Sequence, residues 1–221
     1  YGIHTGLANS YRSYTPVTTD AETIEIKFYL PNAIVAGVTA GHCLGDNNNT
    51  ANQASITLGS DTGTYTDEII TVRSGTATTT QCVRGGTIAA GWHTLRLEYG
   101  TADYDIILDG VSQSFSKTGT VTIHPCDVIR IGLNRASAKP FMSGGVIEYY
   151  KVWDSGATLF FHIESKANGG SYNEITQNLT PTTGGGGSGT LQTFIPIDES
   201  DTTMDVLART PDWSGSAFPR R

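Results

Sequence analysis

The chain has 221 residues, of which only 16% are charged, and its formal net charge is −7 at pH 7. Apart from Arg220-Arg221 it has no cluster of basic residues, so it lacks the positive surface that nucleic-acid binding requires. No apolar run approaches the roughly 20 residues that cross a bilayer, and we therefore expect no membrane insertion.

Period-two alternation of apolar and polar residues predicts the first clear strand, over Thr23–Leu30. Its inward side chains would be Ile24, Ile26, Phe28 and Leu30, and its outward ones Glu25, Lys27 and Tyr29. Pro31 ends this strand because proline has no N–H to donate to a neighbouring strand. A buried strand over Ile34–Ala40 is expected next, followed by the loop Gly45–Asn52.

The central segment Trp92–Val111 carries two alternating strands joined by a short loop. Asp109-Gly110 at its end supplies the positive φ angles of a two-residue hairpin turn. The other expected strands are Ala54–Leu58, Glu68–Arg73, Gln81–Val83, Val128–Leu133, Val146–Trp153 and Leu159–Glu164. No segment has a convincing helical stripe.

An antiparallel meander with one apolar face needs a second sheet to cover that face. The sequence therefore predicts an all-β, two-sheet antiparallel sandwich over residues 1–183. The Gly/Ser run 184–189 predicts a flexible linker. Residues 190–221 are expected to form a tail, which either folds back on the sandwich or docks on a neighbouring subunit.

Three segments together resemble laminin G-like (concanavalin A-like) jelly-roll domains. The central one runs from Trp92-His93-Thr94 to Asp109-Gly110-Val111. Asn9-Ser10-Tyr11 with Ala21–Phe28 is similar to the family's entry strands, and Gly144–Trp153 followed by Leu159 to its closing strand. They follow the family's order and cover most of residues 9–163, so the resemblance implies a jelly roll.

The family's members mostly bind carbohydrates, proteins or steroids without catalysis, sometimes through calcium. They are common in extracellular proteins and phage virions. The resemblance thus implies a binding or assembly module, a virion or surface structural protein that contacts glycans or neighbouring subunits. A secreted carbohydrate-binding lectin is the first alternative.

Ligands of such modules usually bind at loop edges of the sandwich. The candidate ligand-binding residues in this chain are Asp46, Asn48, Tyr65, Asn134, Arg135 and Tyr172. The candidate oxygen donors for calcium are Asp46, Asn47, Asn48, Asp61 and Asp67. Calcium prefers such oxygens, although their spacing matches no defined calcium loop, and turn formation explains them as well. Tyr65, Tyr104 and Tyr172 are aromatic residues that can stack on sugar rings.

The three cysteines Cys43, Cys82 and Cys126 leave two alternatives open. One disulfide with one free thiol is compatible with their number, and small buried thiols are the default in a domain with this much core.

A second alternative is a trypsin-like serine protease. The segment Val38–Cys43 resembles that family's catalytic-histidine motif, which would make His42 the base, Asp105 its orienting partner and Ser143 the nucleophile. However, Met142 and Phe141 stand where the nucleophile loop needs Gly and Asp. The interval between Asp105 and Ser143 is also too short for most of a second barrel.

Overall fold

In a computed structural model the chain folds into antiparallel β-sheets, and no helix occurs among the residues that the structure describes. These are residues 3–4, 10–14, 19–47, 54–60, 65–74, 79–126, 129–132, 141–142, 144–164, 173–175 and 182–185. No helix long and apolar enough to span a membrane is found there.

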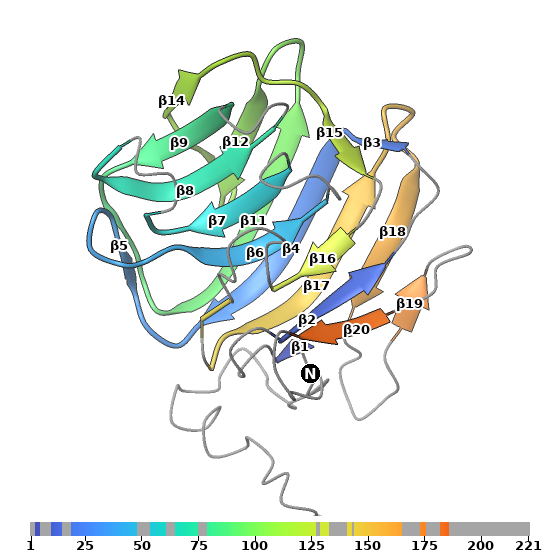
Figure 1. The fold of residues 1–221 in the computed structure, drawn as a ribbon, viewed down its shortest axis with the longest axis horizontal. Coiled ribbons are helices and arrows are strands. Elements are labelled where there is room, and N and C mark those ends of the chain that lie inside the picture. The colour runs from blue at the N-terminus through green and yellow to red at the C-terminus, as the bar shows by residue number, and fades with distance from the viewer. Residues whose placement is uncertain are drawn as a thin grey trace, which may run out of the picture.

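Two eight-stranded sheets face each other, one behind the other in Figure 1. Sheet I has the order β13 (Val111–Ser112), β12 (Tyr104–Leu108), β11 (Gly91–Tyr99), β4 (Thr23–Leu30), β17 (Val146–Trp153), β18 (Leu159–Glu164) and β19 (Asn173–Ile175), with β1 (Ile3–His4) also on β17. Sheet II has the order β14 (Phe115–Thr118), β9 (Thr80–Arg84), β8 (Glu68–Arg73), β7 (Ser55–Leu58), β6 (His42–Asp46), β16 (Ile129–Ile131), β2 (Ser10–Tyr14) and β20 (Thr182–Gly185).

Two small sheets join the ends of the large ones. They pair β10 (Thr87–Ile88) with β5 (Ile34–Val35), and β15 (His124–Cys126) with β3 (Thr19–Ala21). Every pair of named strands is antiparallel, as the expected hairpins require. The fold is thus an all-β, sandwich-like arrangement with a shared interior.

The alternation of the sequence decides which side chains enter that interior. Ile24, Ile26 and Phe28 of β4 are fully buried, and they share one apolar core with residues of sheet II such as Leu44 and Ile56. Tyr29 points to the other face of β4, as expected, where it is buried in a small separate cluster with Val146 and Trp92.

Several strand predictions are confirmed to the residue: Thr23–Leu30, Glu68–Arg73, Val146–Trp153 and Leu159–Glu164. The Asp-Gly hairpin turn is confirmed as well, since Asp109 has φ 52° and Gly110 has φ 78°. The buried-thiol alternative for the cysteines is also confirmed, because all three are free and buried, and the disulfide alternative is wrong.

The prediction of a buried strand over Ile34–Ala40 is wrong. The strand ends at Val35, whose carbonyl accepts from the N–H groups of Val38 at 3.1 Å and Thr39 at 3.0 Å. Gly37 has φ +72°, a left-handed conformation that turns the chain, and Val38 is 80% exposed. The apolar composition of this segment favoured a strand, whereas the left-handed conformation of Gly37 makes it a turn.

Strand β20 includes Gly184 and Gly185, which pair with Tyr11 and Ser10 of β2. They are the first two residues of the expected linker 184–189. The rest of that linker and the tail 190–221 lie outside the described residues, so their division from the sandwich stays a prediction.

A glycine in the core supports the close packing of the two sheets. Gly45 faces the interior from β6, where an added Cβ would lie 2.6 Å from Cε2 of Tyr150 and 2.7 Å from its hydroxyl oxygen. Tyr150 is fully buried, and its hydroxyl donates to Oδ1 of Asn47 at 2.9 Å. The ring therefore has little room to retreat.

Because of this contact, Gly45→Ala is expected to lower the free energy of unfolding by about 1–3 kcal/mol, the usual range for overpacking a core. Urea denaturation measures the change. Gly100→Ala is the matched control, since its Cβ would meet nothing closer than the Asp103 carbonyl oxygen at 3.7 Å. Equal midpoints for the two variants would contradict the expectation.

Candidate functional site

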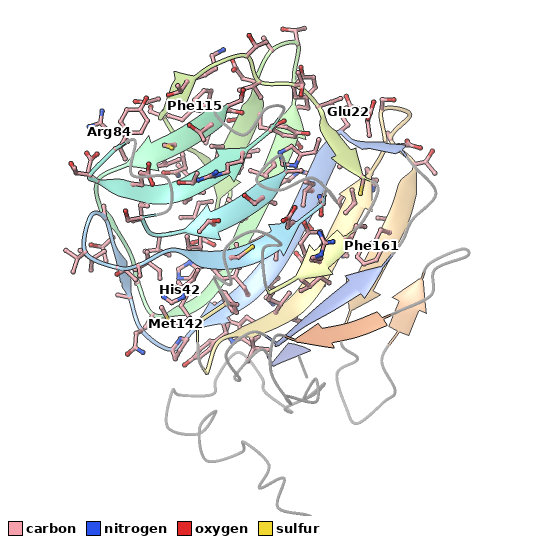
Figure 2. The ribbon with its side chains drawn as sticks, viewed as in Figure 1. Glu22, His42, Arg84, Phe115, Met142 and Phe161 are labelled. Atoms are coloured by element: carbon pink, nitrogen blue, oxygen red, sulfur yellow. The ribbon has the colours of Figure 1, made fainter. Side chains whose placement is uncertain are left out.

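The chain passes from sheet I to sheet II between β13 and β14, and a cavity lies on each side of this crossing. Residues Val111 to Ser114 line one cavity, and Phe115 lines the other. In Figure 2, Phe115 and Arg84 lie at the same end of the molecule, on the neighbouring strands β14 and β9. This edge of the sandwich is where the described residues leave space for a ligand.

The first cavity, here called the edge cavity, has a volume of about 430 Å³ and surrounds the loop between β11 and β12. It is lined by Glu98, Tyr99, Asp103, Tyr104, Asp105 and Phe115, together with residues 100–102 of the loop. The sequence makes this loop tight, because the Gly100 N–H donates to the Asp103 carbonyl at 2.8 Å and Tyr99 pairs with Tyr104. The hairpin thereby brings carboxylates and aromatic rings to one place.

The three carboxylates of the edge cavity have different partners. Glu98 accepts from Nε of Arg96 at 2.5 Å, and Asp103 pairs with Nζ of Lys117 at 2.6 Å. Asp105 accepts at 2.5 Å from the Ser112 hydroxyl, which carries no charge. Asp105 is therefore the carboxylate of this cavity that forms no ion pair within the described residues, and it is the best placed to accept hydrogen bonds from a ligand.

The aromatic residues form the other part of the lining. Tyr99 and Tyr104 lie with ring centroids 5.1 Å apart, and both Tyr99 and Phe115 pack partly against the core. Tyr104 is fully buried, and its hydroxyl donates to the Ala21 carbonyl at 2.6 Å. Burial raises the pKa of the Tyr104 phenol, so it stays neutral. Tyr104 is thus a packing residue rather than the exposed sugar platform that the sequence suggested.

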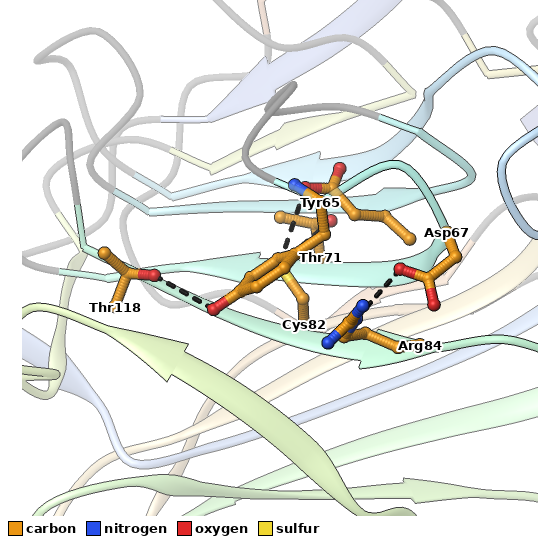
Figure 3. A network of polar contacts seen from close by, with 7 residues as sticks. Tyr65, Asp67, Thr71, Cys82, Arg84 and Thr118 are labelled. Atoms are coloured by element: carbon orange, nitrogen blue, oxygen red, sulfur yellow. Dashed lines mark hydrogen bonds and ion pairs between the residues drawn. The ribbon is translucent and has the colours of Figure 1, made fainter.

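A network of polar contacts lies next to this edge, on the face of sheet II that points away from the core (Figure 3). The guanidinium of Arg84 stands over the ring of Tyr65, 4.7 Å from its centroid, and Nε donates to Oδ1 of Asp67 at 2.8 Å. The Tyr65 hydroxyl contacts Oγ1 of Thr118 at 3.3 Å. The hydrogen bond to Asp67 raises the pKa of Arg84, so the guanidinium keeps its positive charge at neutral pH.

The inner part of this network is buried. Glu68 accepts from the Tyr65 N–H at 3.2 Å, and the Cys82 thiol lies 3.9 Å from Oε1 of Glu68 and 3.7 Å from the hydroxyl of Thr71. Glu68 thus ties the Tyr65 backbone to β8, and Arg84 lies against one face of the Tyr65 ring.

The structure describes two of the six ligand-binding residues that the sequence predicted. Tyr65 belongs to the network above, and Asp46 ends β6 with its side chain fully buried. In sheet II, β7 separates Asp46 from the strand that follows Tyr65, so the two do not share a site. The other four, Asn48, Asn134, Arg135 and Tyr172, lie outside the described residues.

The protease alternative needs a histidine and an aspartate in contact. His42 lies in β6 of sheet II, whereas Asp105 lies on the outward face of β12 in sheet I and bonds to Ser112. The described part of the chain does not bring them together, and Ser143 lies outside it.

Calcium was the cofactor that the resemblance implied. Within the described ranges, no group of three or more His, Cys, Asp or Glu side chains is arranged to hold a metal ion. Calcium binding therefore stays an expectation from the sequence.

Sequence reasoning missed the edge cavity. Its residues stand on two strands and on β14, and only the hairpin and the crossing bring Asp105 close to Phe115. The sequence feature that could have indicated the cavity is the loop Gly100–Asp103, which has Tyr99 before it and Tyr104 after it. Comparison with known proteins adds no assignment, because no family model matches the chain and no curated protein matches it.

Proposed function

We propose that this protein is a non-catalytic binding module that holds part of a glycan in the edge cavity. The observation that carries the proposal is the lining of this cavity, to which Tyr99 and Phe115 contribute aromatic rings and Glu98, Asp103 and Asp105 contribute carboxylates. A sugar ring combines apolar C–H faces with hydroxyl donors. Aromatic side chains pack against the C–H faces, and carboxylates accept hydrogen bonds from the hydroxyl groups.

The size of the cavity supports the same proposal. About 430 Å³ falls within the range of small-ligand sites and holds a mono- or disaccharide unit. Within the proposal, the chain is a laminin G-like jelly roll used in a virion or on an extracellular surface. The sequence resemblance supports that context, and the facing antiparallel sheets are compatible with it.

Binding to a panel of immobilised glycans tests the proposal. We expect retention of at least one glycan, recovered intact after incubation, and about tenfold or greater weakening in Asp105→Asn, because a charge-assisted hydrogen bond is lost. Phe115→Ala should weaken binding as well, through loss of ring contact.

Asp20→Asn is the matched control, since Asp20 is exposed on β3 and does not line the cavity. It should bind as the unmodified chain does. Retention of no glycan, or equal retention by Asp105→Asn and Asp20→Asn, would overturn the assignment of this cavity. Cleavage of the bound glycan would show an enzyme instead.

A further inference from the structure

The second cavity at the same edge is lined by an arginine instead of carboxylates. It has a volume of about 460 Å³ and lies between the end of the β8–β9 pair and the segment that leads from β12 through β13 to β14. Arg84 is the sole charged residue among those described in its lining. In a chain of net charge −7, this cavity, here called the Arg84 cavity, presents a guanidinium whose charge is paired with Asp67 on one side only.

Arg84 is held in place but not fully used. Its Nε donates to Asp67, and its guanidinium rests on the ring of Tyr65. Neither of its two terminal nitrogens has a hydrogen-bond partner in the described part of the chain. The residue is 44% exposed, so a ligand in solution can reach these donors. An arginine oriented in this way offers parallel N–H groups that match the two oxygens of a carboxylate.

The rest of the lining has two kinds of surface. Ile69, Val83, Ile88 and Leu108 provide apolar surface at the boundary of the core. Thr87, Ser112 and Ser114 provide hydroxyls. At Gly85 and Gly86 an added Cβ would meet no atom within 4 Å, so the rim is open there. The lining thus joins one fixed cation to an apolar surface.

From this lining we propose that the Arg84 cavity binds an organic monocarboxylate with an apolar body. The carboxylate lies against the terminal nitrogens of Arg84, and the apolar body covers Ile88 and Leu108. An inorganic anion pairs with the guanidinium but leaves the apolar surface uncovered. A neutral apolar molecule covers that surface but leaves the guanidinium without a new partner. The proposal concerns a second site, and it does not depend on glycan binding in the edge cavity.

Titration of the full chain with octanoate, followed by NMR chemical shifts and calorimetry, tests this inference. We expect saturable binding, with shifts at residues that line the Arg84 cavity. Arg84→Met keeps the apolar stem and removes the charge, and should weaken binding about tenfold or more. Arg84→Lys keeps the charge without the planar group and should give an intermediate affinity.

Two ligands and one variant serve as controls. 1-Octanol and inorganic phosphate should each bind at least about tenfold more weakly than octanoate. Lys151→Met removes a positive charge on the outer face of sheet I, where Lys151 stands over Tyr149, and should leave octanoate binding unchanged. Octanol binding as tightly as octanoate, phosphate competing equally well, or full affinity in Arg84→Met would each overturn the proposal.

Discussion

Acidification from about pH 7 to about pH 4 is expected to lower the free energy of unfolding by about 3 kcal/mol through His124 alone. His124 of β15 is fully buried against the ring of Tyr104, with centroids 4.7 Å apart. Neither of its ring nitrogens has a hydrogen-bond partner of normal geometry. Burial lowers its pKa from 6.5 to about 3, although the backbone of Arg73 favours the charged form.

The sign follows from the lowered folded-state pKa. Between about pH 6.5 and about pH 3 the unfolded chain binds a proton at His124 and the folded chain does not, so stability falls as the pH falls. Each pH unit in this window costs about 1.4 kcal/mol. Above the unfolded pKa the contribution is complete and constant.

Urea denaturation across this range, in parallel with His124→Phe, measures the effect. Phenylalanine keeps an aromatic ring beside Tyr104 and cannot take up the proton. Carboxylates titrate in both proteins, so the difference between their pH profiles isolates His124. We expect the variant to lose about 3 kcal/mol less than the unmodified chain, and superimposable profiles would contradict the assignment.

Replacement of Gln81 by leucine is expected to destabilise the fold by about 2–5 kcal/mol, because it leaves two buried backbone groups without partners. Gln81 is fully buried in β9 of sheet II. Its Nε2 donates to the Tyr104 carbonyl at 2.8 Å, and its Oε1 accepts from the Tyr104 N–H at 2.8 Å. One side chain thus satisfies both backbone groups of a residue in the opposite sheet.

Chemical denaturation and hydrogen exchange at the Tyr104 amide measure this loss. Gln113→Leu is the matched control, since the Gln113 amide donates only to the Val111 carbonyl, two residues away, at 2.8 Å. The control should change stability by less than about 0.5 kcal/mol. If both variants unfold at the same urea concentration, the bond between the sheets is not a determinant of stability.

Gln81 and His124 both bond to Tyr104, and these bonds support the edge between β9 and β12 where the proposed ligand sites lie. Gln81 ties sheet II to Tyr104, and the Tyr104 hydroxyl accepts from the His124 N–H at 2.7 Å. The hairpin that forms the edge cavity is therefore anchored from behind.

Local patterns predicted many of the strands. Alternation predicted β4, because one dry face imposes a period of two on the sequence, and the predicted limits of β8, β17 and β18 are confirmed as well. Asp109-Gly110 determined its hairpin turn because the dipeptide tolerates positive φ angles. Where one glycine reversed an apolar run, at Gly37, the same reasoning failed, because composition does not show which glycine adopts a left-handed conformation.

The sequence by itself determined an all-β chain of antiparallel strands. It left two alternatives open for the cysteines, and the structure decided that all three are free and buried. Only the tertiary structure decided which residues from different strands meet: Gln81 with Tyr104, Arg84 with Tyr65, and Asp105 with Phe115 in the lining of one cavity. The physical reason is that alternation records only which face of a strand is buried. The pairing of sheet edges depends on the packing of the whole core, which no local pattern records.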